Sequence, residues 1–582
     1  MGDKVTCKKE RAIYDFLYSY TFGQRLHILT LIFLLLLGIT MACVQPLIYG
    51  KLIDSVVTIN VKGFKSILFV YFSSVIMVNI LHVMESYYGE WISFRITSKI
   101  KSNVFKNIIL LRCLEIERIG KGELLSRLNG DIEVITTYFI SLVTSVISIL
   151  LNSVISLIFI FNISGNLSKI ALIFIPLSFL VNYYFKKKYG AIQTEKRSYW
   201  DKYYTFQVNV LNNIISFRTY SVEDKYVNLF GNLMEGQWKI TRKEKKLRSH
   251  AVICGSLIMN FSSLLLFYFA AIMIWKNEFS LGNMISFLTY ISYLTKEVDR
   301  ILNLNLESQK VQVCIKRLKD IEKLPSETVL IKEKEDVEIQ VFNLLLVNNV
   351  FFSYVQGRNI LNGISLEINE NGLYTMVGRN GSGKSTLLKL LVRYYDYTSG
   401  DIWFGQKELM NIPLPILRRS VKYISKDAYI ENTSFLENIR FFCDVDDDNE
   451  IINVYEKVGL SDFIESLPER YNTKVGENGI TLSSGQKQKS NIASALVSKA
   501  SILLFDEITS DLDGKSERDI NFILRKESKN KIIIHATHRI NSAREGVKIF
   551  VLDKGRIELA GNHDFLLANS ETYKYLFTYS NG

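Results

Sequence analysis

The sequence predicts an α-helical six-span membrane domain followed by an α/β P-loop nucleotide-binding domain. Six long apolar stretches precede residue 305, a glycine-rich phosphate-binding pattern follows at residues 378–385, and the composition changes abruptly between them, near residue 318. At 582 residues the chain is long enough for several domains. We therefore predict a membrane domain at residues 1–317, a linker at 318–340 and a nucleotide-binding domain at 341–582.

Charge and apolarity occupy different segments of the chain. Hydrophobic residues make up 48%, although 70 basic and 58 acidic residues give a net charge of +12. Many of the lysines and arginines flank apolar stretches, which indicates contact with membrane lipid rather than with nucleic acid. The six cysteines form neither a CxxC pair nor a metal-binding spacing, so we interpret them as reduced thiols.

Each of the six apolar stretches is close to the ~20 residues with which a helix crosses a bilayer. They cover approximately residues 26–48, 67–83, 132–161, 167–185, 252–275 and 284–304. The first is too long for a cleaved signal and lacks a small-residue cleavage site. Basic residues before it place the N-terminus inside, and the loops after spans two and four are long and basic. Both termini are thus predicted to be cytoplasmic.

The two long basic loops are amphipathic and charged, so they cannot lie in hydrocarbon. We interpret them as membrane helices that extend into the cytosol. Polar residues also occur within the spans, where they can either line a substrate path or join helices, and for the amides we favour helix contacts. These residues are Gln45, Asn79, His82, Asn152, Asn182, Asn260 and Asp299.

The pattern G-x-x-x-x-G-K-[ST] lies between an apolar run and a helical one, as in a P-loop. Its glycines let the backbone wrap closely around phosphates, Lys384 adds a positive charge, and Ser385 offers a hydroxyl to Mg²⁺. For the pattern alone, a glycine-rich turn without a ligand is the alternative. The predicted ATP contacts here are Gly378, Arg379, Asn380, Gly381, Ser382, Gly383, Lys384, Ser385 and Thr386.

Four further residues stand at or just beyond the ends of predicted strands. Tyr354 can stack on adenine, and Asp506 can hold Mg²⁺ through water. Glu507 can polarise the attacking water as a general base, an effect of roughly 10²–10⁴-fold, and His538 can donate to the γ-phosphate. Taken singly, Tyr354 also suits the role of a core aromatic residue, Glu507 that of a helix-capping acid and His538 that of a histidine in a loop. Their order and their placement at strand ends favour a nucleotide site.

Residues 482–489 read Leu-Ser-Ser-Gly-Gln-Lys-Gln-Lys and precede a predicted helix. With this motif, the chain resembles an ATP-binding cassette (ABC) exporter half-transporter over essentially its whole length. The resemblance implies that two such chains pair and clamp ATP between the P-loop of one and the signature helix of the other. It also implies coupling helices in exchanged intracellular loops, near residues 115–122 and 208–216. The implied signature contacts are Ser483, Ser484, Gly485 and Gln486.

Two residues depart from the family pattern. Ser484 stands where the signature LSGGQ has its first glycine, and Lys426 stands where the family has a glutamine. A glutamine carbonyl can ligate Mg²⁺, whereas a lysine ammonium has three donors and no acceptor. Lys426 can instead contact a phosphate, and we expect weakened hydrolysis or altered coupling to transport.

The expected function is ATP-driven export of an amphipathic or peptide-like substrate across a bacterial plasma membrane, by a homodimer in preference to a heterodimer. About 25 residues precede the first span, which is too few for the N-terminal cysteine peptidase domain of some peptide-exporting relatives. Two alternatives stay open: one subunit of a heterodimeric multidrug or lipid exporter, and an ATP-gated membrane sensor or immunity protein with little transport.

Overall fold

The computed structural model describes residues 20, 22–327, 340–355, 357–427, 429–476 and 479–580. Except for Arg25, the basic residues before the first predicted span lie outside the described residues, as does most of the predicted linker. The chain forms two compact units, Met1–Lys106 with Gly122–Lys323, and Asn107–Lys121 with Leu324–Gly582. Each unit is a separate structural body and has its own core.

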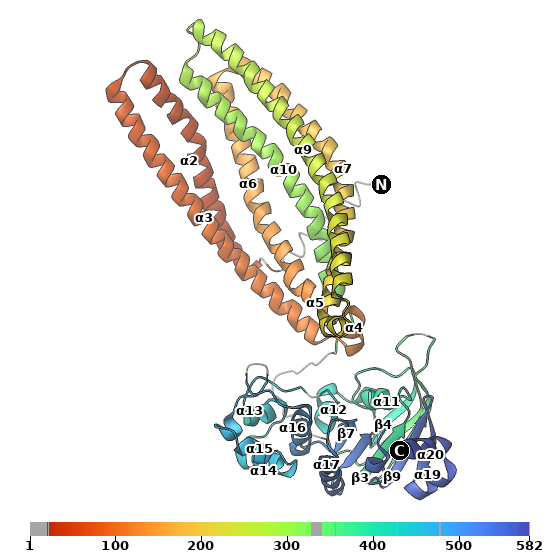
Figure 1. Cartoon of the computed structure of the whole chain (residues 1–582). Coiled ribbons are helices and arrows are strands. Elements are labelled where there is room, and N and C mark those ends of the chain that lie inside the picture. Colours follow the sequence, from red (N-terminus) through yellow and green to blue (C-terminus); the bar gives the residue numbers. More distant parts are fainter. Residues whose placement is uncertain are drawn as a thin grey trace. The chain divides into compact units, whose positions relative to one another are not determined.

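Six long helices build the first unit, and each contains one predicted span (Figure 1). They are α2 (Arg25–Val57), α3 (Val61–Ile109), α6 (Ile132–Ile163), α7 (Gly165–Asn212), α9 (Glu223–Trp275) and α10 (Leu281–Glu322). Within the described residues, four helical segments are both long and apolar enough to cross a membrane: Arg25–Val57, Val61–Ile109, Lys121–Ile163 and Glu223–Trp275. α10 packs against α6 and α2, and α7 packs against α9.

The helices of this unit are longer than a bilayer requires. α7 has 48 residues and α9 has 53, which correspond to about 70 and 80 Å at the rise of an α-helix. The hydrocarbon layer is only ~30 Å thick, so more than half of each helix extends beyond it. Short helices connect the long ones: α4 (Cys113–Ile119), α5 (Lys121–Ser126) and α8 (Ile214–Thr219).

A buried carboxylate joins the helices of the first unit. Glu297 on α10 is 4% exposed and its Oε1 accepts hydrogen bonds from Asn152 Nδ2 on α6 at 2.9 Å and from Arg300 Nη1 at 3.1 Å. The carbonyl oxygen of Asn152 accepts from the Cys43 thiol on α2 at 3.3 Å. Asn152 therefore joins three helices, which agrees with the helix-contact role favoured for the amides. The polar residues singled out from the sequence did not include Glu297.

Replacing Glu297 with alanine removes the acceptor shared by Asn152 and Arg300. Because unpaired polar groups are costly inside a membrane protein, we expect the free energy of unfolding to fall by about 1–3 kcal/mol. Heat or SDS titration of the full-length protein in detergent measures this change. Glu297→Gln is the matched control, since it keeps an acceptor oxygen and should lose less. Equal stability of Glu297→Ala and wild type would show that the hydrogen bonds of Glu297 do not hold the helices together.

Two sheets form the second unit. The larger has the order β10-β9-β3-β8-β7-β6, in which β10 pairs antiparallel with β9 and the remaining neighbours are parallel. Its strands are β3 (Gly372–Gly378), β6 (Val421–Ile424), β7 (Ile502–Asp506), β8 (Ile532–Ala536), β9 (Lys548–Asp553) and β10 (Arg556–Gly561). The antiparallel sheet has the order β2-β1-β4-β5, with β1 (Leu345–Phe352), β2 (Leu361–Ile368), β4 (Ser399–Phe404) and β5 (Lys407–Glu408).

Helices cover both faces of the larger sheet, so its central strands are buried. Every residue of β3, β7 and β8 is buried, as is typical of parallel strands between two helical layers. Along β8, Ile532 and Ile534 belong to one core cluster and Ile533 to the other. The helices are α11 (Lys384–Leu391), α12 (Leu414–Ser420), α13 (Phe435–Phe442), α14 (Asp448–Lys457), α15 (Ser461–Glu465), α16 (Ser484–Val497), α17 (Gly514–Glu527), α18 (Ile540–Ala543), α19 (His563–Asn569) and α20 (Glu571–Ser580).

The short helix α4 belongs to the second unit, although it lies between α3 and α6 in the sequence. Glu117 on α4 accepts a hydrogen bond from the Tyr395 hydroxyl at 2.8 Å, and Arg112 pairs with Asp396 at 2.5 Å. Cys113 and Leu114 pack against the core of the unit. The first coupling segment, expected near residues 115–122, thus overlaps α4.

The second expected coupling segment does not coincide with a single helix. The sequence placed it near residues 208–216, but α7 continues to Asn212 and the short helix α8 covers Ile214–Thr219. The break falls at Asn213, whose φ of −116° and ψ of 18° are not helical. The expected segment therefore includes the end of α7 and only the first turn of α8.

Candidate functional site

The P-loop connects β3 to α11, in the strand–loop–helix order that the sequence predicts. Gly381 (φ +81°) and Gly383 (φ +105°) occupy the left-handed region, which residues with a Cβ disfavour. Lys384 is 5% exposed, and its Nζ donates to the carbonyl oxygens of Gly378 at 2.8 Å and Arg379 at 3.3 Å. Burial lowers the pKa of Lys384, while Glu507 and Asp506 act in the opposite direction. The Lys384 side chain therefore crosses the loop in which a phosphate would bind, and its ammonium donates to carbonyls of that loop.

Asp506 ends β7 next to the first turn of α11. Its Oδ1 accepts from the Ser385 hydroxyl at 2.9 Å, and its Oδ2 accepts from the Tyr423 hydroxyl on β6, also at 2.9 Å. Burial raises the pKa of Asp506, and the two hydroxyl donors oppose that shift. A hydroxyl and a carboxylate side by side are oxygen donors of the kind that Mg²⁺ prefers, so these residues fit the expected metal.

Glu507 and His538 meet because their strands are neighbours. β7 and β8 are parallel with Asp506 opposite Ala536, and the Glu507 amide donates to the Ala536 carbonyl at 2.9 Å. His538 Nδ1 lies 3.5 Å from Glu507 Oε1. The φ of Glu507 is +53°, a strained conformation for a residue with a Cβ and one that concentrates at functional sites. The two predicted catalytic residues thus lie together at the carboxyl edge of the sheet.

Tyr354 follows β1 and packs among aromatic residues. Its ring makes edge contacts with Phe352 and Tyr395 at centroid distances of 4.9 and 5.1 Å. Its hydroxyl lies 3.2 Å from the Thr386 hydroxyl, near the start of α11. The ring is therefore held against the P-loop helix, which leaves its stacking on adenine a prediction.

The signature residues begin α16. Ser483 caps the helix: its hydroxyl accepts from the Gln486 amide at 3.2 Å, and the Gln486 side chain accepts from the Ser483 amide at 2.9 Å. This reciprocal pair is a capping box, so both side chains already have a structural role. Ser484 is exposed at the first helical position, which explains why a hydroxymethyl group is tolerated there in place of hydrogen.

Lys426 lies two residues beyond β6. Its Nζ is 3.5 Å from Asp511 Oδ1, in the loop that follows Glu507. The ammonium is therefore paired within its own chain. The sequence had predicted a phosphate contact for Lys426, and that contact remains a prediction.

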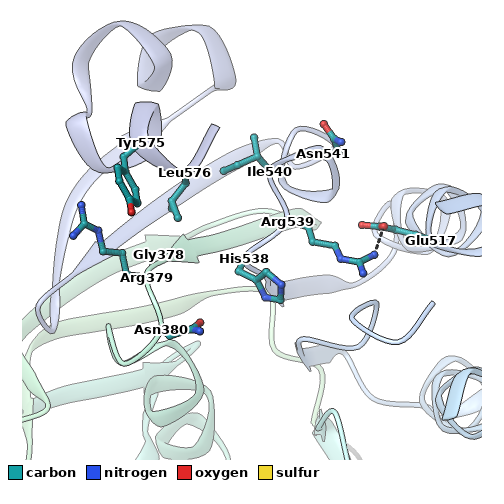
Figure 2. Close-up of a pocket in the computed structure, with 10 residues that line it drawn as sticks. All are labelled: Gly378, Arg379, Asn380, Glu517, His538, Arg539, Ile540, Asn541, Tyr575 and Leu576. Carbon is teal, nitrogen blue, oxygen red and sulfur yellow. Dashed lines mark hydrogen bonds and ion pairs between the residues drawn. The ribbon is translucent and has the colours of Figure 1, made fainter. Parts of the chain in front are cut away.

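A cavity of about 620 Å³ borders the P-loop and His538 (Figure 2). On one side the Arg379 guanidinium lies 4.4 Å from the centre of the Tyr575 ring, so the loop contacts the C-terminal helix α20. On the other side Arg539, the residue after His538, pairs with Glu517 at 2.5 Å. A cavity of this volume is within the range of small-ligand sites.

A buried histidine lies in the strand that leads to His538. His535 on β8 is 1% exposed, and neither ring nitrogen has a hydrogen-bond partner in the part of the chain that the structure describes. Burial lowers the pKa of His535 to about 4. The unfolded chain therefore binds this proton more readily than the folded one, and folded-state stability is lost as the pH falls from about 6.5 towards 4.

We expect His535 alone to remove about 2 kcal/mol of stability from the second unit between pH 7 and pH 5. His535→Val keeps the site apolar and should not show this loss. Hydrogen exchange of the β7 and β8 amides, with variant and wild type compared at each pH, measures the difference. If the two proteins lose protection equally on acidification, the imidazole is not the titrating group.

Two known protein families match the chain. The family described as "ABC transporter transmembrane region" matches residues 28–298, and the family described as "ABC transporter" matches residues 361–510. The chain belongs to the ABC transporter family. It is a half-transporter with one membrane region and one ATP-binding region, so the predicted family and fold class are confirmed. As an ABC transporter it is an ATPase coupled to transport across a membrane, and its relatives indicate export.

Several proteins resemble this ABC transporter. A candidate export ATP-binding/permease protein of Rickettsia bellii is 29% identical over 523 residues, 88% of this chain and 89% of the relative. The lactococcin-G-processing and transport ATP-binding protein LagD of Lactococcus lactis is 28% identical over 531 residues, 89% of this chain and 73% of the relative. A bacterial Atm1-family ABC exporter solved with ATP bound is 21% identical, with a TM-score of 0.81 over 96% of this chain and 99% of that one. It shares the fold.

Proposed function

We propose that two copies of this chain form an exporter that binds MgATP between them and moves an amphipathic or peptide-like substrate out of a bacterial cell. The observation that carries this proposal is the gathering of Lys384, Ser385, Asp506, Glu507 and His538 at one edge of a parallel sheet. This edge belongs to a chain that also carries six membrane-length helices.

The proposed roles follow from the chemistry of each side chain. Ser385 and Asp506 would hold Mg²⁺, Asp506 through water, and the ion would neutralise phosphate charge. The Lys384 ammonium would give up its hydrogen bonds to the carbonyls of its own loop and donate to phosphate oxygens instead. Glu507 would accept a proton from the attacking water, and His538, which is half-exposed beside it, would donate to the γ-phosphate.

We favour a homodimer because this chain contains both halves of the proposed composite site. The P-loop side has its general base Glu507, and the signature helix has an intact cap at Ser483. The exposed N-terminus of α16 offers backbone amides and about half a positive charge to a phosphate of the partner. The docking of α4 on the nucleotide-binding unit supports a coupling role for that helix. A heterodimer with another half-transporter is the competing assembly.

A peptide-like substrate is supported by LagD, which is similar to 89% of this chain and whose name describes lactococcin G processing and transport. We further propose that both termini lie in the cytoplasm, since basic residues flank the first span and fill the loops after spans two and four.

Inside-out vesicles that contain only this chain test the proposal. ATP should drive accumulation of a fluorescent amphipathic peptide, and the peptide should stimulate phosphate release, whereas Glu507→Gln should support neither. Vesicles that bind ATP but accumulate nothing from a panel of peptides, drugs and lipids would favour the sensor alternative. Activity that appears only after coexpression of a second half-transporter would favour the heterodimer.

A further inference from the structure

The ion pair between Lys426 and Asp511 joins two loops at the nucleotide site. β6 and β7 are parallel with Ile424 opposite Phe505, so residue 426 follows β6 as residue 507 follows β7. Lys426 therefore emerges from the sheet alongside Glu507. Its Nζ lies 3.5 Å from Asp511 Oδ1.

The loop that carries Asp511 is anchored on both sides. Arg539 Nη2 donates to the Ser510 carbonyl at 2.9 Å, and Leu512 is 6% exposed. The Ser510 hydroxyl also donates to Asp511 Oδ1, at 3.4 Å. Because the backbone on either side is held, the Asp511 carboxylate has a defined position next to the Lys426 ammonium.

The pair is accessible enough to open. The Lys426 side chain is 50% exposed and that of Asp511 is 34% exposed, and ion pairs in such positions contribute little to stability. A triphosphate carries several negative charges, so it can compete for the ammonium at little cost. In contrast, the buried Lys384 is held by backbone carbonyls and has no carboxylate partner at hydrogen-bond distance in the described residues.

We propose that Asp511 holds the Lys426 ammonium beside the empty nucleotide site, competes with the phosphates for it, and releases it when ATP binds. This inference rests on the proposed function and on the phosphate contact that the sequence predicts for Lys426. Lys426 then supplies charge neutralisation where a metal-ligating glutamine is expected. ATP binding should accordingly depend less on Mg²⁺ in this chain than in its Lys426→Gln variant.

Equilibrium binding of trinitrophenyl-ATP to the full-length protein in detergent, with Mg²⁺ or with EDTA, tests the inference. In EDTA, Lys426→Gln should weaken binding by about threefold to tenfold, with a smaller change in Mg²⁺. Asp511→Asn frees the ammonium from its competitor and should tighten binding by about threefold, as the strength of an exposed ion pair allows. In the Lys426→Gln background, Asp511→Asn should have no effect.

Three further variants separate this competition from a general structural role. Asp511→Glu keeps the competing carboxylate and should bind the nucleotide as wild type does. The double variant Lys426→Asp with Asp511→Lys restores an ion pair but turns an acid towards the phosphates, and it should bind more weakly than Lys426→Gln. Glu527→Gln opens a matched exposed pair with Lys457, 3.2 Å long, and should change nothing.

Equal effects of Asp511→Asn in the wild-type and Lys426→Gln backgrounds would overturn the inference, because the two residues would then act independently. Wild-type affinity of the charge-swapped double variant would also overturn it. Failure of the wild-type protein to bind the nucleotide under either condition would instead contradict the proposed function.

Discussion

Replacement of Glu507 by glutamine is expected to lower the ATPase rate of the full-length protein by at least about 100-fold, the scale of a lost general base. The amide cannot accept the proton of the attacking water, yet it preserves the size of the side chain at its strained φ of +53°. Binding of MgATP should be retained, because the phosphate contacts of the P-loop are untouched. Phosphate release and nucleotide binding, measured on the same preparation, separate these two effects.

The neighbouring carboxylate provides a control for this variant. Asp506→Asn removes a proposed metal-holding group rather than a base, so its activity should recover partly at high Mg²⁺, whereas that of Glu507→Gln should not. Hydrolysis by Glu507→Gln within tenfold of wild type would remove Glu507 from the proposed catalytic role.

Replacement of Lys384 by methionine is expected to weaken ATP binding by about 10–100-fold, because charge-assisted hydrogen bonds to phosphate contribute about 1.5–3 kcal/mol each. Methionine is uncharged and only one atom shorter than lysine, so it can stay buried and the fold should persist. Equilibrium binding of trinitrophenyl-ATP measures the loss, and melting of the protein without nucleotide checks the fold. Lys407→Met, at an exposed position of β5, is the control and should bind ATP as wild type does. Unchanged affinity in Lys384→Met would mean that the P-loop does not bind the triphosphate.

Motifs that act through local backbone geometry were predictable from the sequence. The P-loop pattern requires a strand, a glycine-rich turn and a helix, and the structure has all three in that order. Glu507 and His538 were recognisable because each follows an apolar run that ends as a buried parallel strand. Strands that run in parallel bring their carboxyl ends to one edge, which is why side chains distant in sequence meet there.

Contacts that depend on register and on side-chain direction were not predictable. The hydroxyl of Tyr423 reaches Asp506 only because β6 is the neighbour of β7, and no sequence pattern specifies that pairing. The pair of Lys426 with Asp511 requires the shape of two loops. Glu297 was missed because its hydrogen bond from Asn152 crosses between helices, which no sequence pattern specifies. Its charge is paired with Arg300, one turn further along α10. The break between α7 and α8 at Asn213 was not predicted, because no glycine or proline marks it.

The central claim is that ATP is clamped between the P-loop of one copy and the signature helix of another. Asn380 and Ser484 are both exposed, one in each of these elements, and can be replaced together by cysteine in a Glu507→Gln chain whose native cysteines are replaced by alanine. Oxidative cross-linking of this chain in membranes is the most direct measurement. The account predicts that MgATP increases the cross-linked dimer at least severalfold, and that Lys384→Met abolishes the increase. Cross-linking that is absent, or the same with and without MgATP, would contradict it.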